Sequence, residues 1–222
     1  MTDRVVGRRG FVGGATMALL AAGARGAEKE GEEVAPGEDL MREHGVLRRV
    51  MLVYDEAIQR LNGRQEVPLD VVSAGASIIR RVIEDYHEKL EEDFLFPRFE
   101  KAGKLTDLVT VLRTQHKAGR DVTADVLNLA KGPLRTSADR QHLAGRLHAF
   151  TRMYRPHAAR EDTVLFPAFH ELVGQKAYME LGDQFEDGEK HVLGEGGFEG
   201  AVKEVAKLEA ALSIHDLARF TP

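Results

Sequence analysis

Four stretches of the chain carry apolar residues three and four positions apart, which is the spacing of one face of an α-helix. Short breaks separate these stretches, and none of them shows the strict apolar–polar alternation of a half-buried β-strand. The predicted helices cover approximately residues 38–61, 68–97, 105–131 and 137–167. The pattern therefore predicts an all-α protein.

The breaks contain residues that end or begin helices. Asn62–Gly63 ends the first helix, and Gly132–Pro133 ends the third. Pro97 and Gly103 are predicted to stop the second helix, because proline lacks an N–H and glycine favours helix ends. Ser137 is a good N-cap for the fourth helix. Short loops between long helices favour an up-down-up-down antiparallel four-helix bundle.

The last part of the chain, residues 171–222, is predicted to be a helical extension of a bundle that covers residues 38–170. Helical spacing continues to Phe185, and a glycine-rich loop follows at residues 194–197. A short final helix is expected over residues 202–212. No motif in this extension indicates a function.

The composition narrows the chemistry that the bundle can carry. The chain has 222 residues, of which 43% are hydrophobic and 30% charged, as expected for one soluble domain with appendages. The net charge is -5 and no basic face is concentrated in one region, so nucleic acid is not expected as a partner. The absence of cysteine excludes disulfides, thiolate metal sites and cysteine catalysis. A metal site would have to use histidine and carboxylate side chains.

The N-terminal region resembles an export signal. Adjacent arginines, Arg8 and Arg9, precede a short uncharged apolar run over residues 12–24, as in a twin-arginine signal. We expect residues 1–27 to be this signal, residues 28–37 to be a linker, and the mature protein to be periplasmic or extracellular. The apolar run is too short for a confident membrane span, so no stable span is expected in the mature chain. An ordinary secretory signal or an uncleaved anchor is the alternative.

A repeated motif carries the candidate chemistry. His87 and Glu91 lie four residues apart, so both side chains project from one face of the second helix. The same arrangement recurs on the fourth helix as His157 and Glu161. After each glutamate come an acidic residue, two others and then Leu-Phe-Pro. One His–Glu pair is usually a surface pair worth about 0.2–0.5 kcal/mol, but the matching context favours a shared metal site.

His44 and His116 extend the repeat to the first and third helices, at similar distances from the second histidine of each hairpin. The chain thus contains two copies of one helical hairpin, and two facing hairpins would bring four imidazoles and two carboxylates together. Each of two metals would take two imidazoles, from its own hairpin or from the facing one, and the carboxylates would bridge the metals. Iron and manganese accept such mixed ligation, and zinc is possible. The predicted metal-ligating residues are His44, His87, Glu91, His116, His157 and Glu161.

These six residues and the repeated Leu-Phe-Pro ends resemble the hemerythrin-like, or HHE cation-binding, family over approximately residues 38–170. The resemblance implies a four-helix bundle with a non-haem di-iron centre that binds dioxygen. The four histidines would be terminal ligands, and Glu91 and Glu161 the bridges.

The sequence departs from the oxygen-carrying members of this family. They have two histidines four residues apart on the third helix, whereas Leu112 and Arg120 flank His116 at that spacing. They also use a bridging aspartate five residues after the fourth-helix histidine, where this chain has Glu161 at four. We therefore expect one metal to have an additional open position, or a water or another side chain to fill it, and reversible oxygen carriage does not follow from the pattern.

Other polar residues near the motif are interpreted as structural. Glu88 is a candidate substitute for the missing ligand, but it follows His87 by about 100° around a regular helix, so we expect it to be solvated. Tyr154 is interpreted as a core residue, with a hydrogen bond to the site as the alternative. The remaining histidines fall outside the repeat and are predicted at the surface or in local packing: His142, His148, His170, His191 and His215.

Two classes of function fit the predicted site. One is a binding protein with two non-haem irons that binds or senses dioxygen or nitric oxide, or handles iron. The other is a di-iron oxidase or a peroxide-consuming enzyme that uses the open position. A site that stays empty or takes zinc is a third possibility. A ferritin-like oxidase is disfavoured because it uses Glu-x-x-His, whereas the order here is His-x-x-x-Glu.

Overall fold

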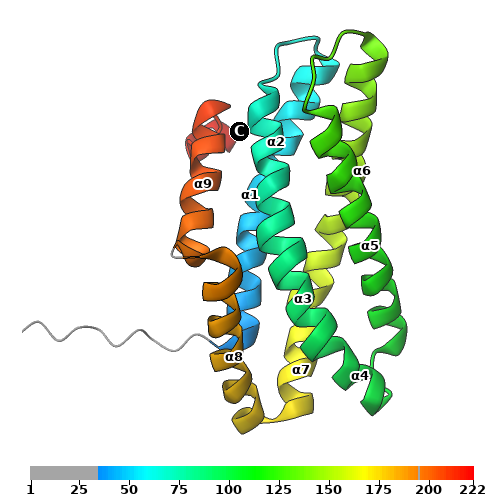
Figure 1. The fold of residues 1–222 in the computed structure, drawn as a ribbon, viewed down its shortest axis with the longest axis vertical. Coiled ribbons are helices and arrows are strands. Elements are labelled where there is room, and N and C mark those ends of the chain that lie inside the picture. The colour runs from blue at the N-terminus through cyan, green and yellow to red at the C-terminus, as the bar shows by residue number, and fades with distance from the viewer. Residues whose placement is uncertain (1–34, 195) are drawn as a thin grey trace, which may run out of the picture. The chain divides into compact units, whose positions relative to one another are not determined.

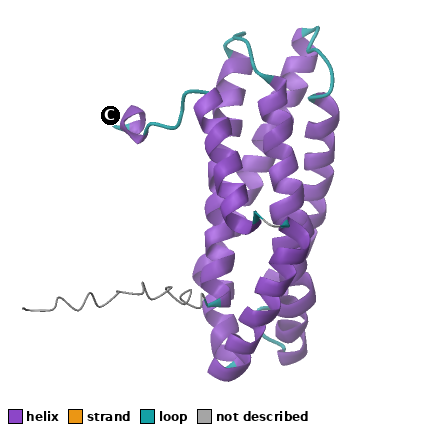
Figure 2. Cartoon of the chain, turned by 60° about the vertical axis from the view of Figure 1, so that its left-hand side comes forward, coloured by secondary structure: helices purple, strands orange, loops and turns teal. Residues whose placement is uncertain are grey.

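The computed structural model describes residues 35–194 and 196–222, so the predicted export signal and residues 28–34 of the predicted linker lie outside the described residues. Within these two ranges every regular element is a helix and there is no strand (Figures 1 and 2). The all-α prediction is confirmed. None of the described helices is long and apolar enough to cross a membrane.

Two of the predicted long helices are each observed as a series of consecutive α- and π-helical segments. The elements in chain order are α1 (Pro36–Asn62), α2 (Leu69–Ile78), η1 (Ile79–His87), α3 (Glu88–Leu90), η2 (Glu91–Leu95), α4 (Phe96–Ala102), α5 (Thr106–Leu129), α6 (Ser137–Arg160), η3 (Glu161–Leu165), α7 (Phe166–Val173), α8 (Gln175–Leu193), α9 (Gly197–Ala211) and the short η4 (Leu217–Phe220).

The π-helical segments η2 and η3 occupy equivalent places in the two hairpins. Each begins at a predicted bridging glutamate, and the backbone N–H of Phe96 donates to the carbonyl of Glu91, five residues back. Phe166 donates to Glu161 in the same way. A proline follows each phenylalanine and cannot donate, so the regular hydrogen-bond ladder is already interrupted there. The repeated Leu-Phe-Pro ends thus coincide with a wider helical turn beside each glutamate.

Several predicted boundaries were wrong. The fourth helix continues past Pro167 to Val173, and the final helix begins at Gly197 rather than at residue 202. Pro97 does not stop the second helix, because it lies in the first turn of α4, where a missing N–H is tolerated. The helix ends at Gly103, which has the left-handed φ of 64°. The first helix begins at Pro36 rather than at residue 38. The N-cap of α6 is Thr136 rather than Ser137, because Thr136 and Asp139 exchange the two hydrogen bonds of a capping box.

The buried apolar residues of the described helices form two clusters. The first extends along α1, α2, α5, α6 and α9 and includes Tyr54, Phe150 and Tyr154. The second gathers the aromatic ends of the two hairpins, among them Phe96 and Phe166. The predicted ligand histidines lie between them: His157 packs on Tyr154, His116 on Phe96, and His44 on Phe166.

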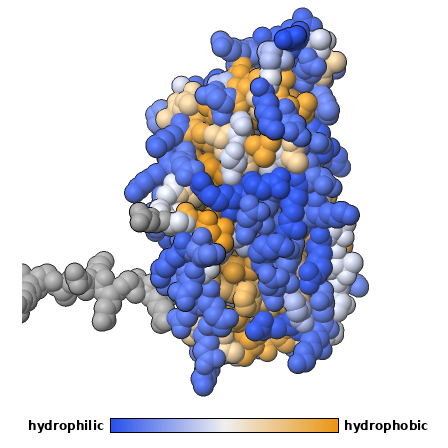
Figure 3. Space-filling model, in the orientation of Figure 1, coloured by the Kyte–Doolittle hydropathy of each residue, from blue (hydrophilic) through white to orange (hydrophobic). Residues whose placement is uncertain are grey.

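Helices α8 and α9 pack along the first hairpin (Figure 1). Arg49 donates twice to the carboxylate of Glu209 on α9, at 2.8 and 2.6 Å. Tyr86 donates its hydroxyl hydrogen to the carbonyl of Phe185 on α8 at 2.9 Å. Hydrophilic side chains cover most of the face in Figure 3, with hydrophobic groups between them. The C-terminal extension is thus held to α1 and η1 by specific polar contacts.

Candidate metal centre

All six predicted ligand residues lie together in the interior. They come from α1, the second helix, α5 and the fourth helix, and each is almost fully buried. His157 is the most exposed of the six, at 3%. Such burial of four imidazoles and two carboxylates is costly unless their polar atoms find partners.

The imidazoles form two pairs, each within one hairpin. The ring centroids of His44 and His87 lie 4.6 Å apart, and those of His116 and His157 lie 5.1 Å apart. The pattern left open whether a pair would come from one hairpin or from both. In the structure each pair comes from its own hairpin.

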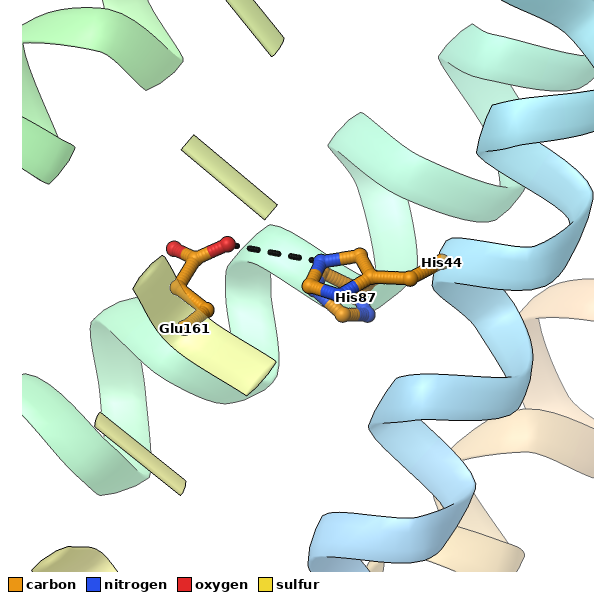
Figure 4. Close-up of side chains that lie close together, drawn as sticks. All are labelled: His44, His87 and Glu161. Carbon is orange, nitrogen blue, oxygen red and sulfur yellow. Dashed lines mark ion pairs between the residues drawn. The ribbon is translucent and has the colours of Figure 1, made fainter. Parts of the chain in front are cut away.

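The two carboxylates lie between these pairs. Oε2 of Glu161 is 3.3 Å from Nε2 of His44, and its Oε1 is 3.0 Å from Nε2 of His157. Figure 4 shows this carboxylate pointing toward the rings of His44 and His87. Oε2 of Glu91 lies 3.3 Å from Nε2 of His116 and 3.7 Å from Nε2 of His87. Each carboxylate therefore meets a histidine of both pairs, which is the position of a bridge.

The outer nitrogen of each ring faces a second polar side chain. The Nδ1 contacts are His44 to Asp162 at 2.6 Å, His87 to Glu43 at 2.6 Å, His116 to Glu92 at 3.2 Å, and His157 to Gln115 at 2.9 Å. A neutral imidazole that donates from Nδ1 keeps the lone pair of Nε2 for a metal. The contacts thus orient all four rings with Nε2 toward the carboxylates.

These four partners were not predicted from the sequence, although the repeat contains a pattern that identifies them. Glu92 and Asp162 are the acidic residues that directly follow the two bridging candidates, and Glu43 and Gln115 directly precede the first histidine of each hairpin. Their equivalent positions in the two copies are the available indication. Which ring each would meet depends on how the helices pack.

The inner atoms of the site lack hydrogen-bond partners among the described residues. Both carboxylate oxygens of Glu91 and of Glu161 have none of acceptable geometry, and neither do Nε2 of His87 and Nε2 of His116. Leaving such groups unpaired costs about 1–3 kcal/mol each. Ligand atoms bonded to one ion at about 2.0–2.2 Å lie about 3 Å apart, close to the contacts seen here. A transition metal therefore fits this set of donors.

Three groups of side chains among the described residues could each hold an ion, with the ligand atoms of each group within 4.8 Å of one another. They are His44, His87 and Glu161; His116, His157 and Glu161; and Glu88, Glu92 and His116, so Glu91 belongs to none of them. Glu161 belongs to the first two groups, as a bridging carboxylate would. The geometry thus accommodates two neighbouring ions.

The charges of the metal-free site follow from burial and from the neighbouring groups. Burial and the charge of Glu161 raise the pKa of Glu91 well above its usual range. Burial would also raise the pKa of Glu161, but His157 and His44 outweigh it and hold that pKa well below the usual range. Burial and the charge of His44 lower the pKa of His87. Burial and the neighbouring charges therefore favour the neutral forms of Glu91 and His87 and the ionised form of Glu161.

The predicted solvated role of Glu88 was wrong. The residue is 1% exposed, and Tyr154 donates its hydroxyl hydrogen to Oε1 at 2.6 Å while Arg120 lies 2.8 Å from Oε2. A position about 100° around the helix from His87 still faces the interior, where Tyr154 of α6 and Arg120 of α5 meet the Glu88 carboxylate. Tyr154 is a core residue, as predicted, and it bonds Glu88 rather than any of the six. Leu112 is buried without contributing a ligand.

The five remaining histidines have exposed side chains, which confirms the prediction that they lie at the surface. They are His142, His148, His170, His191 and His215.

Comparisons with known proteins agree with the geometry. A family model described as the hemerythrin HHE cation binding domain matches residues 35–169. The chain is 46% identical over 196 residues to uncharacterized proteins of Mycobacterium bovis and of Mycobacterium tuberculosis, covering 88% of this chain and 76% of theirs. No solved structure gives a significant match.

Proposed function

Because this chain belongs to the hemerythrin HHE cation binding domain family, whose model matches residues 35–169, we propose that it is a non-haem di-iron protein that binds or senses a small ligand such as dioxygen or nitric oxide. Membership of this family establishes a helical cation-binding domain. We propose iron as the metal, two ions per chain and a small diatomic ligand. We also propose the up-down-up-down order of the four-helix bundle, with α8 and α9 as its appendage.

One observation carries the proposal. Four Nε2 atoms and two carboxylates converge in the interior, and several of these atoms have no hydrogen bond within the described residues. His44 and His87 would hold one iron, and His116 and His157 the other. Glu91 and Glu161 would bridge them. Manganese and zinc accept similar donors and are the alternatives.

The surrounding residues would orient the metal-binding atoms and exclude water from the site. Asp162, Glu43, Glu92 and Gln115 hold the rings in the tautomer that presents Nε2 inward. Phe96 and Phe166 stack on ring faces and exclude water on the side of the hairpin ends. When bound, iron would supply redox chemistry and coordination positions for a diatomic ligand.

The same open positions support the alternative of a di-iron oxidase or peroxide-consuming enzyme. Two imidazoles and two shared carboxylates would give each ion four protein donors, fewer than the six of an octahedral ion. Positions remain for an exogenous ligand, whether it is bound reversibly or consumed.

One experiment separates these functions. The full chain is loaded with ferrous iron without oxygen, iron is counted per chain, and the visible spectrum is followed as oxygen is admitted and removed. Two irons and a reversible spectral change support ligand binding. Irreversible oxidation with catalytic loss of added peroxide supports the enzyme, and absence of iron uptake contradicts both.

We also propose export by the twin-arginine route, supported by Arg8 and Arg9 in a region outside the described residues. That route carries folded proteins and would suit a chain that binds its metal before export. Replacing both arginines with lysine should retain the protein in the cytoplasm. Unchanged fractionation would contradict the proposal.

A further inference from the structure

The two halves of the candidate centre differ in what lies outside them. The first half, His44 and His87, lies on the side that α8 covers, because α8 packs against η1 and α1. Tyr86, directly before His87, holds α8 by its hydrogen bond to Phe185. The equivalent residue before His157 is Pro156, which has no polar group for such a contact.

A cavity of about 100 Å³ adjoins the second half. It lies between α5 and α6, and its wall includes His157 and its hydrogen-bond partner Gln115. The rest of the wall is Leu108, Val111, Leu112, Pro156 and Arg160. This cavity is lined by residues of α5 and α6 alone.

The first hairpin has a related cavity that does not adjoin its histidine. Pro36 and Asp39 occupy the positions of α1 that correspond to Leu108 and Val111 of α5, and they line a cavity of about 190 Å³. Its other wall is α8, including Phe185 and Glu189, and neither His87 nor Glu43 lines it. Beside the first hairpin, α8 thus supplies the second wall of the cavity, whereas the cavity of the second hairpin is bounded by that hairpin's own two helices.

We propose that a small ligand reaches the centre through the cavity between α5 and α6 and binds at the His116–His157 half. The inference rests on the proposed di-metal site and adds the route and the half that receives the ligand. A volume of 100 Å³ exceeds the space that one water needs, so it admits a diatomic or triatomic molecule. The guanidinium of Arg160 at the wall favours neutral or anionic ligands over cations.

Val111 offers a way to block this route without disturbing the core, because its side chain is 51% exposed at the cavity wall. Val111→Trp places a large ring over the entrance. Leu52→Trp is the matched control, since Leu52 is 37% exposed and lines a different cavity, between α1 and α6. Circular dichroism establishes that both variants keep the helical fold.

The first measurement uses the iron-loaded, oxidised full chain and azide, a small anion that ligates ferric iron. We expect Val111→Trp to slow azide association at least tenfold at unchanged iron content. Leu52→Trp should leave the rate at the wild-type value. Unchanged association in Val111→Trp, or equal slowing in both variants, would overturn the route.

The second measurement uses the metal-free chain and therefore does not depend on iron. Acylation by diethyl pyrocarbonate, located by mass spectrometry, should modify His157 faster than His87, and Val111→Trp should slow only His157. Equal protection of the two histidines would overturn the route even in a chain that binds iron. Failure to bind iron with rapid His157 acylation would instead contradict the proposed function and leave the cavity as the access path.

Discussion

Nδ1 of His87 lies 2.6 Å from Oε2 of Glu43, and both side chains are buried. The equivalent ring of the other hairpin meets the neutral amide of Gln115 at 2.9 Å. A carboxylate partner makes an imidazole a stronger donor to a metal than an amide does. The two halves of the centre should therefore bind metal with different strengths.

This difference predicts that Glu43→Gln and Gln115→Glu change metal affinity in opposite directions. Glu43→Gln should weaken binding at the His44–His87 half by about 10–100-fold, because it removes the acid that can ionise behind His87 when a cation binds. Gln115→Glu should strengthen binding at the other half. Titration with ferrous iron against a competing chelator measures both affinities. Equal affinities in the wild type, unaffected by either exchange, would contradict the argument.

Loss of a bridging carboxylate should lower the metal content. Glu91→Ala and Glu161→Ala each remove a donor that lies between the two histidine pairs, so the loaded protein should hold fewer than two irons per chain. His148→Ala, which changes an exposed histidine outside the repeat, is the control and should bind as the wild type does. Elemental analysis after desalting gives the ratio. Unchanged stoichiometry in both glutamate variants would refute the bridging assignment.

The repeat in the sequence was sufficient to select the six residues that the structure brings together. His87–Glu91 and His157–Glu161 stand at the same helical spacing and before the same Leu-Phe-Pro ends, and this context sets them apart from the exposed histidines. Periodicity was also sufficient for the all-α fold. Both features depend on positions along single helices, which the sequence displays directly.

The partners of the rings could not be predicted because they depend on contacts between helices. Glu43 meets His87 across two helices, and the rotation of each helix decides that contact. Glu88 was misplaced because its burial depends on Tyr154 and Arg120 of two neighbouring helices. The position of α8 depends on tertiary packing around Phe185. The amphipathic pattern of α8 predicts an apolar face but not the helix against which that face packs.

Close packing of α5 against α6 predicts a strong effect at Gly119. A Cβ there would lie 2.7 Å from Cζ of Tyr154 and would also overlap its hydroxyl oxygen. Gly119→Ala should therefore destabilise the protein by about 1–3 kcal/mol through overpacking. Urea unfolding followed by circular dichroism measures the change.

Gly145→Ala is the matched control, since Gly145 lies in α6 with nothing within 4 Å of the new Cβ. In the interior of a helix this substitution should stabilise the protein by about 0.5–1 kcal/mol, because glycine loses more backbone entropy on folding than alanine does. If both variants lose stability equally, the contact with Tyr154 is not the cause.

Buried carboxyl groups predict that the metal-free protein loses stability as the pH rises above 7. Burial raises the pKa of Glu43, Glu88 and Glu91 well above the ordinary value of 4.5. In each case the folded state holds a proton that the unfolded state has already released, so the free energy of unfolding falls with rising pH until the folded pKa is reached. His87 and His116 have lowered pKa values and act in the opposite direction, but their effect is complete once unfolded histidine is neutral, above about pH 7.

Thermal unfolding of the metal-free chain between pH 7 and 9 measures this dependence. The Tm should fall across that range, and Glu88→Gln, which keeps the shape of the side chain and removes its ionisation, should reduce the slope. Iron loading should reduce it too, because a bound cation stabilises the charged form of Glu91. A Tm that stays constant from pH 7 to 9 in the metal-free wild type would show that these carboxyl groups have already ionised in the folded state by pH 7.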